Sequence, residues 1–392
     1  MLSRVEEPPG ADADPCFRSG SESFRTARFW LTGDCRIEPF DECALLFSEA
    51  GQQLSRLEGA SALLAPLLQR GATMAELRAA LMDQDVPAQA AEAWVVSLIE
   101  QLAGFCLLRV DTPNPTPRKH RQLLQLGSLT VELAYSSDAL ADRISPIFSH
   151  LESGATPAAA CYRIAEFGAG LAQIGDDGRS SLLVPADELA VRVKGILLER
   201  MFRDCGSFAA LHAACLSNGE HGILLLGSPG GGKSTLALAL LGRGYAFASD
   251  DVTLLNRDGT VTGVPLAPGI KEGSWTIAER LGASLTPLPA HERPDGQSVR
   301  FAQIDFERIA PRCPIRTIVT LERSEGAVPE LRPMRSEEAL GELLRESRSS
   351  DGRCSVETMA ALARLVRGAA AFHLHYAEAM QAADLIAAAR EP

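Results

Sequence analysis

The sequence predicts an α/β protein built from two domains, a small α+β domain of winged-helix type followed by a larger α/β domain. With 392 residues the chain is longer than one ordinary hydrophobic core serves, so two domains are expected. Hydrophobic residues make up 46% of the chain, which is ample for burial. In the larger domain, apolar runs typical of β-strands alternate with helix-like segments, and an α/β sandwich requires this alternation.

Composition excludes several classes of function. A formal net charge of -12 argues against a nucleic-acid partner, because nucleic-acid binders concentrate positive charge on one face. The chain has no apolar run of about 18 residues, so no membrane span and no membrane partner are expected. Its first residues, MLSRVEEPPGADADPC, lack the apolar core of a signal peptide, which favours a cytoplasmic location. Nine cysteines without a Cys-x-x-Cys pair predict reduced, mostly buried thiols.

The small domain is expected over residues 26–110, after a disordered lead-in over residues 1–25 that mixes Pro, Gly, Asp, Ser and Glu without periodicity. The runs RFWL and CRIEPF are expected to supply a further strand ahead of the hairpin. The runs CALLF and QQLSRLE flank a Ser-Glu-Ala-Gly break and predict a β-hairpin. A final short strand is expected at FCLLRV.

Three helices are predicted between the hairpin and the last strand. Apolar residues recur at helical spacing through ASALLAPLL, and Gly71 ends that helix. Thr73 and Glu76 form a capping box that opens the second helix. The third helix follows Pro87 and carries one apolar stripe, which Gly104 ends.

A hairpin strand beside an amphipathic helix offers a sheet edge to which an extended peptide can add. A helical cap that serves only stability or oligomerisation fits the same pattern. The run from PFDECALLF to EQLAGFCLL resembles the PqqD-like family, also called RiPP recognition elements. The resemblance implies that this domain binds the leader segment of a ribosomally made precursor peptide, between the strand edge and the last helix. The matching positions are Leu57, Gly59, Leu67, Thr73, Glu76, Leu77 and Gly104.

Residues 111–125 predict a linker, because DTPNPTPRKH alternates prolines with polar residues and ends in a basic cluster. The larger domain is expected over residues 126–392. Its predicted strands include SLTVELAY, ILLL, AFAS and TIVTL. Its predicted helices cover residues 187–202, 234–241, 336–346 and 359–366.

The segment from Gly227 to Ser234 fits the P-loop pattern G-x-x-x-x-G-K-[ST]. Glycines allow the tight bends by which backbone N–H groups converge on a phosphate. An apolar run precedes the loop and a helix-like segment follows it, as a phosphate site at a helix N-terminus requires. Lys233 is expected to reach the β- and γ-phosphates, and Ser234 a magnesium ion. The predicted cradle comprises Gly227, Ser228, Pro229, Gly230, Gly231, Gly232, Lys233, Ser234 and Thr235.

Asp250 and Asp251 follow the AFAS run soon after the P-loop helix. A P-loop enzyme needs a carboxylate at the end of a nearby strand to hold magnesium. Two adjacent acids allow two roles, one on the metal and one removing a proton from an attacking hydroxyl. An ordinary polar turn after a strand would also place acids here.

The P-loop region resembles the HPr serine kinase family, whose short P-loop core also occurs in phosphoenolpyruvate carboxykinases. The resemblance implies an HPr-kinase/PEP-carboxykinase-like catalytic domain that uses ATP and Mg2+. It implies that Asp251 holds the metal together with Ser234, that Asp250 is the general base, and that His212 lies beside the base. The segments that carry it are LHAA, GSPGGGKSTLALALLGRGY, SDDVTLL, VPLAPGIKEGS and FHLHYAE, within roughly residues 126–392.

Three further basic residues follow the paired acids. Lys271 lies in a predicted loop after two prolines and could neutralise charge on the transferring phosphoryl group, although a solvated surface lysine fits as well. Arg293 and Arg300 flank a polar loop, HERPDGQSVRF, and are most simply interpreted as surface residues. The longer stretch by which HPr kinases engage their phosphocarrier protein is not found, so phosphorylation of that carrier is not expected.

Together the two domains predict an ATP-dependent kinase that phosphorylates a Ser or Thr hydroxyl of a precursor peptide held by its leader. Tethering would raise the effective concentration of a weakly bound acceptor. Two alternatives stay open: a nucleotide-responsive module that binds or escorts a peptide without phosphotransfer, and a small-molecule hydroxyl kinase. HPr kinases assemble as oligomers, which adds a homo-oligomer to the expectations. The acceptor's identity, the modified residue, the order of Asp250 and Asp251 as base and metal ligand, any phosphorylase activity and the oligomeric state stay open.

Overall fold

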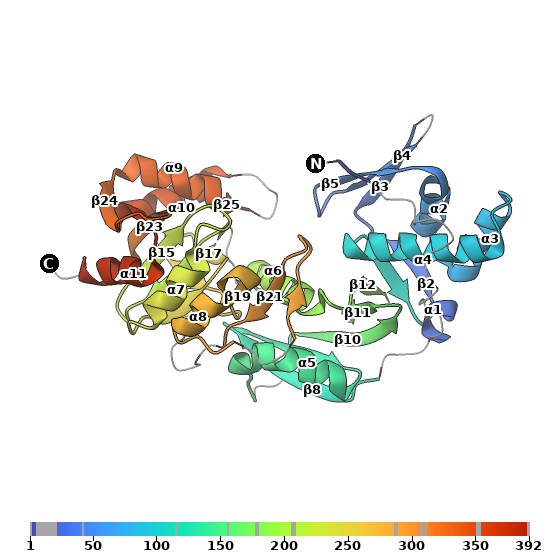
Figure 1. The fold of residues 1–392 in the computed structure, drawn as a ribbon, viewed down its shortest axis with the longest axis horizontal. Coiled ribbons are helices and arrows are strands. Elements are labelled where there is room, and N and C mark those ends of the chain that lie inside the picture. Colours follow the sequence, from blue (N-terminus) through green and yellow to red (C-terminus); the bar gives the residue numbers. More distant parts are fainter. Residues whose placement is uncertain are drawn as a thin grey trace. The chain divides into compact units, whose positions relative to one another are not determined.

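The computed structural model divides into two compact units, drawn in Figure 1. Unit 1 comprises Met1–Gln122, Glu132–Asp142 and Ala160–Arg192, and unit 2 comprises Leu123–Val131, Arg143–Ala159 and Val193–Pro392. The structure describes residues 2–4, 22–40, 43–113, 117–154, 157–176, 180–204, 209–285, 289–303, 305, 309, 312–349 and 354–389. No helix in these ranges is long and apolar enough to cross a membrane.

Unit 1 contains a four-stranded sheet with the strand order β1-β5-β4-β3. The predicted hairpin is confirmed, because β4 and β5 pair antiparallel with Phe47 opposite Leu54. The outer edge of β5 is taken by β1, which pairs with it in parallel. The strands are β1 (Leu2–Arg4), β3 (Cys35–Pro39), β4 (Ala44–Ser48) and β5 (Gln53–Leu57).

The three helices predicted for this part of the chain are present. Gly71 ends α2 at a φ of +85°, and a side chain there would clash with the ring of Trp30, so glycine is required. Thr73 accepts a hydrogen bond from the backbone of Glu76 and completes the predicted capping box at the start of α3. The helices are α1 (Glu22–Thr26), α2 (Gly59–Arg70), α3 (Met74–Met82) and α4 (Ala88–Gly104).

A second sheet has eight strands in the order β6-β2-β7-β12-β11-β10-β9-β8. In it β7 pairs with β2 on one side and with β12 on the other, both antiparallel. The strands are β2 (Arg28–Leu31), β6 (Ala72–Thr73), β7 (Leu108–Asp111), β8 (His120–Leu126), β9 (Leu129–Tyr135), β10 (Ala160–Gly168), β11 (Leu171–Gly175) and β12 (Ser181–Pro185).

Unit 1 extends beyond the small domain that was predicted to end at residue 110. The ring of Phe167 packs against Phe24 and Phe29, with ring centroids 5.4 and 5.9 Å apart, so residues from β10 share one core with the N-terminal helices. The predicted linker over 111–125 contains the start of β8, while residues 114–116 lie outside the described residues. Most of the predicted lead-in also lies outside them, but β1 and α1 fall within its range or at its end. The winged-helix assignment stays a prediction.

Unit 2 is a layered α/β structure around a six-stranded sheet with the order β16-β14-β15-β23-β26-β24. Five-stranded and three-stranded sheets follow the orders β22-β18-β17-β13-β25 and β19-β21-β20. The strands are β13 (Ala209–Leu211), β14 (Ala214–Ser217), β15 (Gly222–Leu226), β16 (Ala246–Ser249), β17 (Thr253–Leu255), β18 (Val261–Gly263), β19 (Gly269–Lys271), β20 (His291–Glu292), β21 (Ser298–Phe301), β22 (Arg312–Cys313), β23 (Ile315–Arg323), β24 (Glu330–Met334), β25 (Ser347–Arg348) and β26 (Ala370–Tyr376).

Helices cover both faces of the six-stranded sheet. Alternate residues of β15 enter two different cores: Ile223 and Leu225 pack with α7 and α11, whereas Leu224 and Leu226 pack with α9 and α10. This explains why β15 is a continuous apolar run rather than an alternating one. The helices between residues 138 and 388, of which α7, α9, α10 and α11 pack on this sheet, are α5 (Asp138–Phe148), α6 (Leu189–Asp204), α7 (Lys233–Leu241), α8 (Trp275–Arg280), α9 (Ser336–Glu346), α10 (Val356–Arg367) and α11 (Ala379–Ala388).

Three neighbouring strands bring the candidate residues of unit 2 to one edge of this sheet. β14 is antiparallel to both β15 and β16, with Ala214 opposite Leu225 and Cys215 opposite Ser249. β15 and β16 therefore point the same way, and their carboxyl ends lie beside the start of β14. We call this the site edge: it consists of residues 212–214, 226–235 and 249–251.

Candidate active site

The predicted P-loop lies between β15 and α7, in the strand–loop–helix context that the motif requires. Gly230 and Gly232 have φ values of +84° and +93°, in the left-handed region that favours glycine. The hydroxyl of Tyr376, on β26, donates a hydrogen bond to the carbonyl of Gly231 at 3.0 Å. A Cβ on Gly232 would clash with the same hydroxyl. The loop conformation is thus tied to a neighbouring strand.

Lys233 is the first residue of α7 and points back across the loop. Its side chain is only 7% exposed, and Nζ donates a hydrogen bond to the carbonyl of Gly227. Burial lowers the pKa of Lys233, while the charges of Asp251 and Glu346 oppose that shift. The loop thus combines a buried ammonium group with a helix N-terminus, and both favour a bound anion.

Asp250 and Asp251 occupy a turn that is held on both sides. The Thr253 hydroxyl donates to the carbonyl of Ala213 at 2.9 Å, so the Ser249 hydroxyl must donate to Thr253, at 2.6 Å. Ser249 and Thr253 are fully buried. The two ends of the turn that carries the aspartates are therefore held in place.

Asp250 points inward, toward the P-loop helix, and is 6% exposed. Burial raises the pKa of Asp250, whereas the charge of Lys194 and a hydrogen bond from Ser234 act to lower it. Oδ1 of Asp250 is buried without a hydrogen-bond partner among the residues that the structure describes. An orphaned carboxylate oxygen is costly unless a further group binds it.

Asp251 points outward and its side chain is 62% exposed. It contacts His212, with Oδ1 3.1 Å from Nε2, and this hydrogen bond lowers the pKa of Asp251 to about 2. The same bond raises the pKa of His212. The other ring nitrogen, Nδ1, lies 3.0 Å from Oε2 of Glu346. Because both nitrogens face carboxylates, the imidazolium form satisfies both contacts.

Residues of unit 2 that could bind a magnesium ion are Ser234 and Asp250. Their hydrogen bond places a hydroxyl and a carboxylate together, and the orphaned Oδ1 adds an oxygen without a partner. In the described part of the chain no three His, Cys, Asp or Glu side chains form a complete metal site. Mg2+ usually binds one or two carboxylates plus phosphate oxygens and waters, so this donor set fits the ion.

Lys194 is a site residue that the sequence did not indicate. It lies on α6, and Nζ donates a hydrogen bond to the carbonyl of Ala267 at 2.8 Å. Burial lowers the pKa of Lys194, and the charges of Asp250 and Asp251 counteract this. A single lysine in an amphipathic helix has no motif, so only the fold reveals that it lies near the paired acids.

Lys271, which was predicted in a loop, is the last residue of β19. Its charge contributes to lowering the pKa of Lys233, which places it in the electrostatic neighbourhood of the P-loop. Burial acts to raise the pKa of Asp295, whereas contacts from Arg293 and, more weakly, the charge of Lys271 lower it. Lys271 is half-buried, and its role in catalysis stays a prediction.

The two arginines of the polar loop differ from each other. Arg293 forms an ion pair with Asp295 at 3.2 Å, and its charge acts to lower the pKa of Lys194. Arg300 stacks on Trp275, with Cζ 4.4 Å from the ring centroid. Arg293 therefore lies near the site, whereas the described contact of Arg300 is structural.

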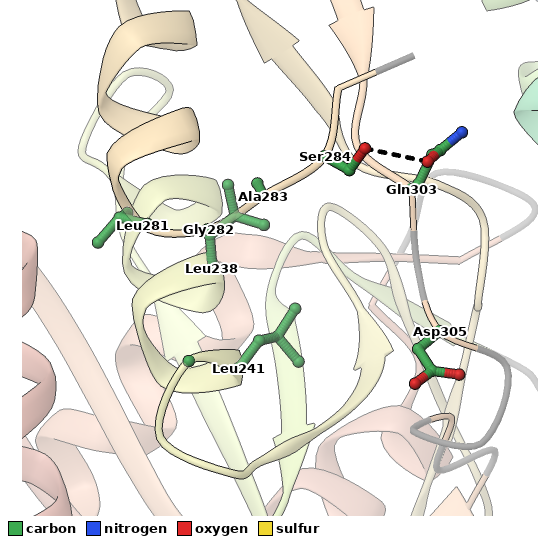
Figure 2. Close-up of a pocket in the computed structure, with 9 residues that line it drawn as sticks. Leu238, Leu241, Leu281, Gly282, Ala283, Ser284, Gln303 and Asp305 are labelled. Carbon is green, nitrogen blue, oxygen red and sulfur yellow. Dashed lines mark hydrogen bonds between the residues drawn. The ribbon is translucent and has the colours of Figure 1, made fainter.

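A separate cavity of about 230 Å3 lies beside the C-terminal end of α7, and Figure 2 shows the residues that line it. Ser284 donates a hydrogen bond to Oε1 of Gln303 at 3.1 Å on its polar side. Because this lining contains neither the loop nor the paired acids, the cavity is not the candidate active site. The lining residues are Leu238, Leu241, Gly242, Leu281, Gly282, Ala283, Ser284, Gln303 and Asp305.

Comparisons with known proteins leave the family open. No protein-family model matches the chain, and the comparison with curated proteins gave no match. Among solved structures, the chain is similar to the Hpr(Ser) kinase/phosphatase from Coxiella burnetii at 14% identity, over 46% of this chain and 95% of that chain. The TM-score is 0.26, which is too low to establish a shared fold.

Proposed function

We propose that this protein is a phosphotransferase that uses ATP and Mg2+ to phosphorylate a hydroxyl group. The observation that carries the proposal is the composition of the site edge. It combines a P-loop with a buried lysine, one buried aspartate bonded to the P-loop serine, and one exposed aspartate bonded to a histidine. These are the parts that phosphoryl transfer needs: a phosphate cradle, a metal-binding pair and a base.

We assign the nucleotide phosphates to the loop and Lys233, and the metal to Ser234 and Asp250. A bound Mg2+ would neutralise charge on the phosphate oxygens. The resemblance implied Asp251 for the metal and Asp250 for the base. Burial of Asp250 beside Ser234 supports the reverse order, because a metal-binding carboxylate belongs next to the P-loop hydroxyl.

Asp251 is then the group that accepts the proton of the attacking hydroxyl. Its exposure leaves room for an acceptor to approach, and a pKa of about 2 keeps the carboxylate ionised at neutral pH. A weak base suffices where phosphoryl transfer passes through a loose transition state. The imidazolium of His212 holds Asp251, and the charge of Lys194 offsets the two acids.

We propose that the acceptor is a Ser or Thr hydroxyl of a ribosomally made peptide. The resemblance to peptide-recognition domains supports this, as does the edge of β5. In this structure β1 pairs with that edge, with Ser3 opposite Ser55, so the edge can accept an added strand, and a leader peptide would have to replace β1 there. A small-molecule acceptor and a peptide escort without phosphotransfer remain the competing functions.

The test is transfer of labelled γ-phosphate from ATP to candidate peptides, followed by mass spectrometry of the product. Asp251→Asn should abolish transfer and retain ATP binding, whereas Asp250→Asn should weaken Mg2+ binding and raise the Mg2+ concentration needed for half-maximal activity. Asp258→Asn is the matched control, because Asp258 lies in an exposed turn and pairs with Arg312 at 2.8 Å.

Two results would contradict this proposal. Failure of every hydroxyl acceptor to gain phosphate would leave only a nucleotide-responsive binding module. Equal KM values for peptides with and without their leader segments would remove the peptide-recognition role and favour a small-molecule kinase.

A further inference from the structure

Glu346 contacts His212 through both its side chain and its backbone. Oε2 of Glu346 lies 3.0 Å from Nδ1 of the imidazole. The backbone N–H of His212 donates to the carbonyl of Glu346 at 2.8 Å. Two contacts from one residue fix both the position of the histidine backbone and the orientation of its ring.

Glu346 is itself held firmly. It is the last residue of α9, and the chain continues directly into β25, which pairs with β13. In that ladder Ser347 lies opposite Leu211, the neighbour of His212. The Ser347 hydroxyl also donates to the carbonyl of Leu344 at 2.9 Å. The end of α9 is therefore a fixed support for the histidine.

The contacts form a continuous series from Glu346 through His212 to Asp251. The two carboxylates lie 3.0 and 3.1 Å from opposite nitrogens of one ring. Such a series, in which a third group orients the partner of a reactive residue, is the arrangement found around many catalytic bases and nucleophiles. Lys233 is a further charged group near the ring, and its pKa also responds to Glu346.

We propose that Glu346 is a positioning residue, which acts through His212 to hold Asp251 where the acceptor hydroxyl arrives. This rests on the proposed phosphotransfer function. Asp251 is exposed, so its carboxylate has little packing of its own to fix it. Its orientation depends on a ring that cannot rotate while Glu346 binds the far nitrogen. Small displacements of a reacting group can cost about 100-fold in rate.

The experiment is a double-mutant cycle on kcat for phosphotransfer. Glu346→Ala and His212→Ala should each lower kcat by about tenfold or more, with little change in the KM for ATP. The double variant should be no slower than His212→Ala alone, because both changes break the same series. Glu346→Gln should restore much of the loss, since its amide oxygen can still accept from Nδ1.

Glu342→Ala is the matched control. Glu342 lies on the same helix and is about as exposed as Glu346, 26% against 23%, but it pairs with Arg345. Its loss should leave kcat unchanged within about twofold, as expected for an exposed pair. Should Glu346→Ala fail to fold, the same cycle is built on Glu346→Leu, whose side chain fills similar space but cannot accept the hydrogen bond from Nδ1.

The possible outcomes distinguish failure of the positioning role of Glu346 from failure of the proposed phosphotransfer function. A wild-type protein that transfers phosphate together with an unaffected Glu346→Ala variant, or additive losses in the double variant, would overturn the positioning role alone. A wild-type protein that transfers no phosphate would overturn the proposed function and the positioning role with it. Coupling between Glu346 and His212 in urea unfolding would then show that the contact exists without that role.

Discussion

Substitution of Gly232 by alanine tests how the P-loop conformation is held. Gly232 has a φ of +93°, and an added Cβ would clash with the hydroxyl of Tyr376. Gly230 is a matched control in the same loop, with a φ of +84° and no atom within 4 Å of an added Cβ. The two substitutions share the cost of the left-handed backbone, so their difference isolates the clash.

The magnitudes follow from these contacts. An alanine in the left-handed region costs about 1–2 kcal/mol, which is the whole expected loss for Gly230→Ala. Gly232→Ala must also displace Tyr376, a side chain that is 1% exposed, and overpacking of this kind costs about 1–3 kcal/mol more. We therefore expect Gly232→Ala to lower the free energy of unfolding by about 2–5 kcal/mol.

Tyr376→Phe should change the stability in opposite directions in the wild type and in the Gly232→Ala variant. In the wild type it should destabilise by about 0.5–1.5 kcal/mol, because the 3.0 Å hydrogen bond to Gly231 is lost. In the Gly232→Ala background it should stabilise, because it removes the atom that clashes.

The assay is urea unfolding of unit 2 by the fluorescence of Trp275, with Trp30 and Trp94 of unit 1 replaced by Phe. A single reporter is needed because a chain with two compact units need not unfold in one step. Equal losses for the two glycine variants, or a Tyr376→Phe effect of the same sign in both backgrounds, would refute the reasoning.

Three further predictions address charge. Lys233→Met should weaken ATP binding about 10- to 100-fold, because a charge-assisted phosphate contact is lost; calorimetric titration giving an unchanged Kd would contradict it. Lys194→Met should destabilise unit 2 by about 1–3 kcal/mol, because the buried negative charge of Asp250 loses a nearby positive charge. Asp250→Asn in that background should restore stability. Urea unfolding that shows no restoration would contradict an interaction between Lys194 and Asp250. His291 is fully buried with neither ring nitrogen bonded among the described residues, and burial lowers its pKa to about 4. The unfolded state takes up its proton first as pH falls, so unfolding free energy should drop by up to about 3 kcal/mol between pH 6.5 and 4, and His291→Leu should remove that part of the pH dependence.

Local signals in the sequence predicted the local structure well. The Thr73 capping box, the glycine stop at Gly71 and the hairpin around residues 48–51 all depend on residues within a few positions of one another. The P-loop strand and helix were predicted for the same reason. Hydrogen-bonding and steric preferences act over such short distances, so no knowledge of distant segments is needed.

The boundary between the units could not be predicted in this way. The strand at Leu108–Asp111 lies between β2, which precedes it, and β12, which comes some seventy positions later in the chain. Phe24 and Phe167 pack in one core, and no local sequence pattern predicts this contact. The segment between β7 and β8 has the proline-rich composition of a linker, although both strands belong to the same sheet. The extent of unit 1 is therefore determined by strand pairing between segments that are distant in the sequence.

The site was predictable as far as its motif extended. The loop, Lys233 and the paired acids were proposed from the residues themselves, and His212 and the separate roles of the acids came from the resemblance. Lys194 and Glu346 were missed, because each is an ordinary residue at the inner side or end of an amphipathic helix. They join the site only because α6 approaches Asp250 and because β25 pairs beside His212. The functional role of such residues cannot be predicted until the order of the strands in the sheets is known.

The order of the two aspartates follows from the turn that carries them. Ser249 and Thr253 are bonded to each other and to the start of β14, so the turn cannot rotate to exchange its side chains. One carboxylate must then face the P-loop serine and the other must face solvent and the histidine. A metal ligand needs an oxygen beside the phosphates, whereas a base needs an open path to its acceptor. The buried Asp250 suits the first requirement and the exposed Asp251 the second, which adjacent letters in a sequence could not distinguish.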